Sequence, residues 1–169
     1  MERLRDHEPQ ASRPYMPGYN LHDASDGRGL LPWSWAIERL TRAHNYWLAT
    51  TRPEGLPHCM PVWGVWLDER FYFSSGRRSR KARNLAANPN CVVSTERADE
   101  AVILEGVAKL VTERAQLQPF YDAYQAKYRW DMEAMGEPIY VVRPVRAFGF
   151  TEAELTGTAT RWTFDDVIR

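Results

Sequence analysis

The stretch FYFSSGRRSRKARNLAANPN, residues 71–90, carries more information about this chain than any other segment. It opens with the apolar strand pattern FYFSS and closes in a helical pattern that the pair Asn88-Pro89 is expected to end. Between the two, five of the seven residues from Arg77 to Arg83 are basic. The sequence therefore predicts a strand, a basic connection and a short helix.

The position of the positive charges narrows their role. Ser79 is a suitable helix cap, so Arg80 and Lys81 fall in the first helical turn, where cations oppose the helix dipole at about 0.3–1 kcal/mol each. Three interpretations are open: a solvated helix face, a nucleic-acid site, or a site for a small phosphate-bearing ligand. A bound phosphate would reverse the unfavourable dipole interaction, and Ser74 and Ser75 could donate hydroxyls to it. We favour the phosphate site.

The composition of the chain limits the classes of partner, metal site and cellular location that are expected. The chain has 169 residues, with 22 Lys plus Arg against 22 Asp plus Glu, and this balance is unlike that of a general nucleic-acid binder. The two cysteines, Cys59 and Cys91, show no metal-binding spacing, so we expect no metal site. No apolar run is long enough to cross a membrane and the first residues are not a signal peptide, so a cytoplasmic protein is expected.

Hydrophobic patterning predicts one domain after an N-terminal arm. Residues 1–30 are polar and aperiodic and are expected to form an extended arm, and residues 31–169 to form the domain. A helix should start with Pro32 at its first position and run to about Ala43. Further helices are expected at 79–88 and 113–130, and strands at 45–51, 56–67, 71–75, 91–96, 101–112, 139–152 and 160–164. This order predicts a mainly β (α+β) fold, a small antiparallel β-barrel with flanking helices.

The segment GLPHCMPVWGVWLDERFYFSSGRRSRKARNLAANPNCVV, residues 55–93, resembles the core of the split β-barrel family typified by pyridoxamine 5′-phosphate oxidase. The Gly55-x-Pro57 turn, the strand from Met60 to Val65, and Ser-Arg-Lys-Ala followed by Asn-Pro carry this resemblance. It covers roughly residues 32–164, including the final TATRWTF. It implies a homodimer that binds FMN at the subunit interface.

The resemblance also implies which residues hold the cofactor. Arg80 and Lys81 would bind its phosphate, assisted by Ser74 or Ser75, and the strand residues would lie along the ring. Arg161, in the final segment, completes the set. The implied cofactor-binding residues are thus Met60, Pro61, Val62, Trp63, Ser74, Ser75, Arg80, Lys81 and Arg161.

Residues that differ from those of the oxidase limit which reaction is expected of this chain. Met60 and Val65 stand where the oxidase has Arg and Lys, and Arg161-Trp162-Thr163 replaces its Arg-Leu-His. Oxidation of vitamin B6 is therefore not expected, and the resemblance implies a flavin-dependent oxidoreductase with a small uncharged substrate. The alternatives are a reductase that uses the 8-hydroxy-5-deazaflavin coenzyme and a non-catalytic flavin carrier or sensor. No catalytic side chain is assigned, and neither nucleic acid nor a membrane is an expected partner.

Overall fold

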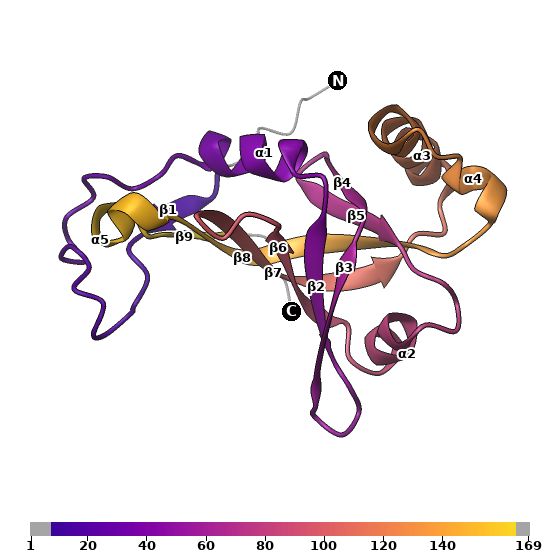
Figure 1. The fold of residues 1–169 in the computed structure, drawn as a ribbon, viewed down its shortest axis with the longest axis horizontal. Coiled ribbons are helices and arrows are strands. Elements are labelled where there is room, and N and C mark those ends of the chain that lie inside the picture. Colours follow the sequence, from indigo (N-terminus) through magenta and orange to yellow (C-terminus); the bar gives the residue numbers. More distant parts are fainter. Residues whose placement is uncertain (1–7, 165–169) are drawn as a thin grey trace.

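The computed structural model describes residues 8–164. They form an open, split-barrel-like antiparallel sheet flanked by helices (Figure 1), which confirms the predicted fold class. The strands are β1 (Gln10–Ser12), β2 (Tyr46–Thr51), β3 (Pro57–Val62), β4 (Gly64–Leu67), β5 (Arg70–Ser74), β6 (Asn90–Thr95), β7 (Glu100–Leu110), β8 (Ile139–Thr151) and β9 (Thr160–Thr163). The helices are α1 (Trp33–Arg42), α2 (Arg80–Ala87), α3 (Arg114–Tyr128), α4 (Met132–Met135) and α5 (Leu155–Thr158), with a 3₁₀ turn at Glu152–Glu154.

The long strand β8 organises the sheet. Along one edge it pairs with β7, and along the other it pairs first with β5 and then with β9. The remaining strands continue in the order β7-β6-β2-β3, so β3 lies at an edge. Pro57 and Pro61 both lie in β3. Two prolines restrict a strand to an edge, to a bulge, or to a place where a ligand replaces the ladder, and β3 takes the first of these positions.

The prediction of one continuous strand over residues 56–67 is wrong, because the structure has two strands there. The chain leaves the ladder at Trp63, so that β3 pairs with β2 whereas β4 pairs with β5. Asp68 and Glu69 both have positive φ and close the two-residue hairpin between β4 and β5. The two strands therefore belong to different parts of the sheet, and the break between them lies beside the candidate site.

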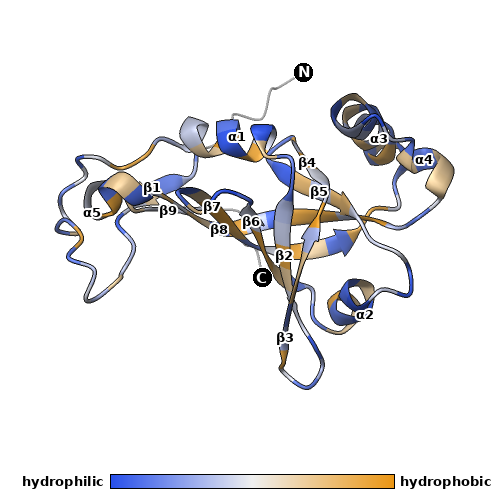
Figure 2. Cartoon of the chain, viewed as in Figure 1, coloured by the Kyte–Doolittle hydropathy of each residue, from blue (hydrophilic) through white to orange (hydrophobic). Residues whose placement is uncertain are grey.

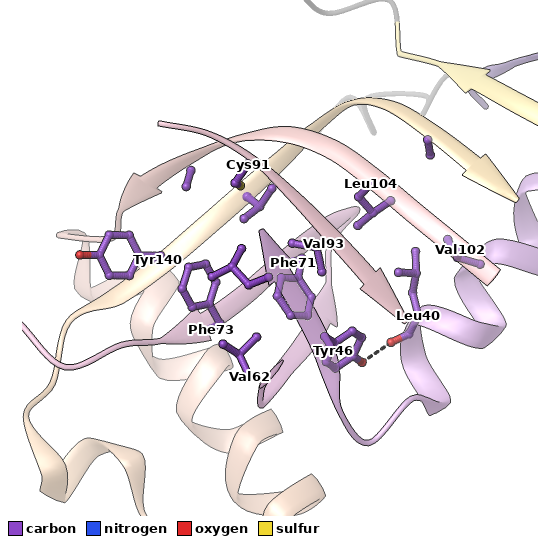
Figure 3. Close-up of a cluster of buried hydrophobic side chains, with 14 of the residues drawn as sticks. Leu40, Tyr46, Val62, Phe71, Phe73, Cys91, Val93, Val102, Leu104 and Tyr140 are labelled. Atoms are coloured by element: carbon purple, nitrogen blue, oxygen red, sulfur yellow. Dashed lines mark hydrogen bonds between the residues drawn. The ribbon is translucent and has the colours of Figure 1, made fainter. Parts of the chain in front are cut away.

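The main core lies between α1 and the inner face of the sheet (Figure 3). Alternation along β2 turns Tyr46 and Leu48 inward, and Phe71 and Phe73 of β5 stack in the same layer. Figure 2 shows the hydrophobic residues concentrated in the strands. The fully buried aromatic and aliphatic side chains of this core are Ala36, Leu40, Tyr46, Leu48, Phe71, Phe73, Val93, Val102, Leu104, Val142, Ala147 and Trp162.

A second, smaller core fixes α3 on the sheet. Val65 and Tyr72, on β4 and β5, pack against Phe120 and Tyr124 of α3 and against Ile139 of β8. Pro119 lies inside the helix, yet within its first two turns. The α3–α4 segment is consequently held over the β4–β5 hairpin, on the side of the molecule that also carries α2 (Figure 1).

Several short elements were not predicted, and all lie at the margins. Pro32 stands at the N-cap position of α1 and not at the first helical position, where it was predicted. The elements β1, α4 and α5 have too few residues to show a periodic pattern in the sequence.

In the N-terminal arm, the buried Arg13 donates to the carbonyls of Gly157 (2.6 Å), Ala159 (3.0 Å), Asp26 (3.1 Å) and Arg28 (2.9 Å). The division into an arm of 1–30 and a domain of 31–169 stays a prediction. Within residues 8–164, no helix combines the length and apolar character that a membrane span requires.

Candidate functional site

A cleft of about 260 Å³ opens where the ends of β3 and β5 meet the start of α2. The α4 region closes it on the far side. Six of the nine residues predicted to bind a cofactor line this cleft, and they come from segments that are separate in the sheet. These six are Pro61, Val62, Trp63, Ser74, Ser75 and Lys81.

The first turn of α2 forms one end of the cleft. Ser79 caps the helix as predicted, because its Oγ accepts the N–H of Ala82 at 3.0 Å. The Oγ atoms of Ser75 and Ser79 lie 2.7 Å apart, so these two hydroxyls share a hydrogen bond at the cleft wall. The hydroxyl of Ser74 instead donates to the carbonyl of Pro138 at 3.1 Å, which occupies its only hydrogen. Ser75 and Ser79 are thus the better placed hydroxyls.

The cations at this end have no acidic partners. Within residues 8–164, every ion pair lies elsewhere, and the side chains of residues 77–83 form none. Arg80 and Lys81 are half-buried, whereas Arg83 is exposed. The first turn of α2 contains no acidic residue that would offset them. Unpaired cations, a capped helix start and two hydroxyls fit a phosphate group.

One carboxylate limits where an anion can bind. Glu137 lines the cleft and accepts the backbone N–H of Arg77 at 3.2 Å, so its negative charge faces the loop before α2. A phosphate would be repelled from this side. The favourable position is therefore beside Ser79 and Lys81 rather than beside the loop of Arg77.

The other end of the cleft is apolar and aromatic. Trp63 is 39% exposed, and its ring lies parallel to that of Tyr128, with centroids 4.6 Å apart. Its indole N–H donates to Oδ1 of Asn45 at 3.2 Å. Tyr124 and two methionines of α4 complete this end, which suits a flat, largely apolar ring. The residues concerned are Trp63, Tyr124, Met132 and Met135.

Trp66 has a different place. Its ring lies 6.0 Å from that of Trp33 in an edge-to-face arrangement, and it packs against the main core. Of the two tryptophans in this region, only Trp63 reaches the cleft.

At the break between β3 and β4, the backbone N–H and carbonyl of Gly64 form hydrogen bonds with side chains from the end of α3. The hydroxyl of Tyr128 lies 3.0 Å from the N of Gly64 and 2.8 Å from its carbonyl, and Nζ of Lys127 donates to the same carbonyl at 3.0 Å. Lys127 also donates to the hydroxyl of Tyr46 at 2.8 Å. Burial lowers the pKa of Lys127 to about 8 and raises the pKa of Tyr128 to about 12. This contact holds Trp63 at the cleft wall.

The remaining predicted residues lie outside the cleft within one subunit. Arg80 is next to Lys81 on α2 but does not line it, and Met60 is 45% exposed on β3. Arg161 lies on β9, at the far side of the sheet from α2 (Figure 1), and its Nε donates to the hydroxyl of Ser12 at 3.2 Å.

Sequence reasoning identified none of the cleft residues that come from the chain after residue 93, namely Tyr124, Met132, Met135 and Glu137. The spacing of Tyr124 and Tyr128 indicated a helix face, but nothing local showed which strands that face would contact. The α4 turn has only four residues and offered no period. These side chains enter the site through the packing of α3 on β4 and β5.

Solved structures of other proteins are similar to this chain in fold. An F420 reductase matches with a TM-score of 0.54 and 26% identity, over 65% of this chain and 93% of that one. A conserved hypothetical protein from Mycobacterium tuberculosis matches with a TM-score of 0.65 and 20% identity, over 75% and 88% of the chains. The heme storage protein of Vibrio cholerae matches with a TM-score of 0.54 and 17% identity, over 66% and 86%.

No curated protein matches the chain in sequence. The family model described as pyridoxamine 5′-phosphate oxidase matches residues 36–157, which is well over half of the chain and includes the whole segment from β3 to α2. Because this match covers well over half of the chain, the chain belongs to the pyridoxamine 5′-phosphate oxidase family.

Proposed function

We propose that this chain is an oxidoreductase that binds FMN or the 8-hydroxy-5-deazaflavin coenzyme in the cleft and passes hydride to or from a small uncharged substrate. The observation that carries the proposal is that Arg80 and Lys81 form no ion pair and stand at the start of α2, which Ser79 caps. The cleft beside this helix start has aromatic side chains at its opposite end. A phosphate at one end and a flat ring at the other describe a flavin-type cofactor.

Different residues of the chain would bind the two ends of the cofactor. Lys81, Arg80 and the Ser75–Ser79 hydroxyl pair would hold the phosphate, while Pro61, Val62 and Trp63 would position the ring. When bound, the cofactor supplies the hydride chemistry, and the protein supplies orientation and exclusion of water. No general base is required for hydride delivery, so the lack of an acid–base pair among the cleft residues is compatible with this role.

The uncharged substrate follows from the strand around the break. Met60 is apolar, and Val65 is buried beneath α3 rather than facing the cleft. Beyond Lys81, the cleft has no cation that could bind a second phosphate on a substrate at the aromatic end. A neutral acceptor such as a quinone or an enone suits that end.

A homodimer would explain Arg161. Cross-strand partners share one face of a sheet, so Pro61, Trp47, Ser94, Ile103, Phe148 and Arg161 form one row across the outer face, opposite the core. Trp47 is 48% exposed, and a hollow of about 390 Å³ opens on this face. Packing two outer faces around a two-fold axis along the strands would bring Arg161 of the partner subunit opposite Pro61.

Absorbance and fluorescence titrations of the purified chain with FMN and with the deazaflavin coenzyme test the cofactor proposal. Changing Arg80 and Lys81 together to Ala should abolish binding, whereas the exposed Arg83→Ala, which removes the same kind of charge from the same helix, should not. Failure to bind either cofactor would refute the proposal, and preferential binding of heme would replace it. A bound cofactor that no reductant and neutral acceptor can turn over would indicate a carrier.

Light scattering after size exclusion tests the dimer separately. Trp47→Glu places a charge in the middle of the outer face and should convert a dimer to a monomer without changing the far-UV circular dichroism. A wild-type chain that is monomeric at micromolar concentration would refute the dimer and leave Arg161 without a role in the site.

A further inference from the structure

Three strand ends meet beside Trp63 at the cleft wall. Tyr46 of β2 pairs with Val62 of β3 on one side and with Thr95 of β6 on the other. Both pairings are antiparallel, so the residue before Tyr46 stands level with the residues that follow Val62 and Thr95. These three neighbours are Asn45, Trp63 and Glu96. Sheet pairing therefore brings together side chains that no local sequence pattern had grouped.

A series of hydrogen bonds connects the three side chains. Glu96 accepts the backbone N–H groups of His44 at 2.9 Å and of Asn45 at 3.2 Å, and it accepts the side-chain amide of Asn45 at 3.0 Å. Oδ1 of Asn45 in turn accepts the indole N–H of Trp63 at 3.2 Å. A carboxylate only accepts and an indole N–H only donates, so one orientation of the amide satisfies both neighbours. Glu96 thus fixes the amide, and the amide fixes one edge of the indole.

The ring contacts of Trp63 leave one of its faces uncovered. Its ring is parallel to that of Tyr128, with 4.6 Å between centroids and 4° between planes. His44 lies 5.8 Å from Trp63 and 5.2 Å from Tyr128, and Tyr124 lies 6.4 Å and 4.7 Å from the same two rings. A ring on the outer face of Trp63 would lie much farther from Tyr128 than from Trp63. Within residues 8–164, no aromatic ring therefore covers that outer face.

The ring behind Trp63 is fixed as well. The hydroxyl of Tyr128 lies 2.8 Å from the carbonyls of both His44 and Gly64. Trp63 is consequently held on one face and along one edge, although it is 39% exposed and lines the cleft. A side chain that is locked by its neighbours before binding loses little conformational entropy when a ligand arrives. A flat wall of this kind suits a flat ligand ring.

We propose that Asn45, oriented by Glu96, is a positioning residue that fixes Trp63 so that its uncovered face stacks on the flat ring of the cofactor. The inference rests on the proposed function and deepens it, because it assigns the contact by which Trp63 holds the ring and the residue that aims it. Asn45 itself does not line the cleft, so it acts only through Trp63.

Fluorescence titration of the full chain with FMN and with the deazaflavin coenzyme tests the inference through two readouts. The first is the dissociation constant, and the second is the quenching of cofactor emission at saturation, which reports contact with the indole independently of affinity. Trp63→Leu removes the stacking face and should lose at least half of the quenching. Asn45→Leu should lose part of the quenching and weaken binding by about 2- to 12-fold, the factor that one neutral hydrogen bond represents.

A double-mutant cycle separates positioning from a general structural effect. Trp63→Phe keeps an aromatic ring but has no N–H for Asn45 to accept, so adding Asn45→Leu to it should change neither readout further. The control is Trp66→Phe, because Trp66 packs against the main core and does not line the cleft. It should leave both readouts unchanged.

The outcomes distinguish this inference from the proposed function. Unchanged quenching in Trp63→Leu or in Asn45→Leu would overturn the inference while the cofactor site stands. An equal effect of Asn45→Leu with Trp or Phe at position 63 would also overturn it, since Asn45 would then act by another route. If neither cofactor binds the wild type, the proposed function fails and the inference fails with it. Thermal unfolding shows which variants are folded, and Trp63→Phe and Asn45→Leu break the same hydrogen bond from opposite ends, so either can replace the other.

Discussion

Substituting Lys81 by Gln should weaken cofactor binding and stabilise the free protein at the same time. The first effect follows from the phosphate contact, since hydrogen bonds to charged groups contribute about 1.5–3 kcal/mol, or about 10- to 150-fold in Kd. The second follows from position: Lys81 is the second residue of α2, where a cation opposes the helix dipole by about 0.3–1 kcal/mol. Gln keeps most of the side-chain stem, so loss of packing is small.

The two effects are measured on the same preparation. Differential scanning fluorimetry without ligand should show Tm rising by about 1–4 °C, the shift that this free energy produces in a chain of this size. Titration with the preferred cofactor should show the weaker Kd. Arg83→Gln is the control, because Arg83 is exposed and lies later in the same helix. A variant with lower Tm and unchanged Kd would show that Lys81 is an ordinary packed side chain and would refute the dipole argument.

Three further perturbations test the scaffold and the charge near the strand break. Arg13→Ala removes a buried guanidinium that donates to four carbonyls, so it should lower the free energy of unfolding in urea by about 2–4 kcal/mol, and a change within 0.5 kcal/mol would contradict this role. Gly64→Ala should cost more than about 2 kcal/mol in the same assay, because a Cβ there would lie 2.7 Å from the carbonyl of Tyr72 and 2.3 Å from Cζ of Phe71; normal stability would mean that β4 can shift. Burial lowers the pKa of Lys127 from 10.5 to about 8, so between these values the unfolded state holds more protons, and the stability of the wild type relative to Lys127→Met should rise from pH 8 to 9.5. A flat difference across this range would show that Lys127 is solvated.

Many of the strands and helices could be predicted from the sequence, because the patterns that indicate them involve residues close together in the chain. Alternation in YWLATT and CVVSTE, the Ser79 cap and the Asn88-Pro89 stop each act over a few residues, and the strands and helix lie where these patterns indicated. The two prolines of β3 limited that strand to an edge, a bulge or a ligand-lined position, because each lacks an N–H, and this is also a local property. The break at Trp63 was missed although Pro61 and Gly64 flank it, because its cause is the pairing of β3 and β4 with different strands.

The sequence by itself determined that a run of cations stands at the start of a capped helix, since both the cap and the dipole depend on residues within one turn. Only the tertiary structure decided what surrounds those cations. Packing of α3 on β4 and β5 brought Tyr124 and the methionines of α4 to one end of the cleft. The β2–β3 hairpin placed His58 where burial, and then the charges of Lys81, Arg52 and Arg80, lower its pKa. Such contacts join residues far apart in the chain, and they arise from the burial of shared apolar faces rather than from any local pattern.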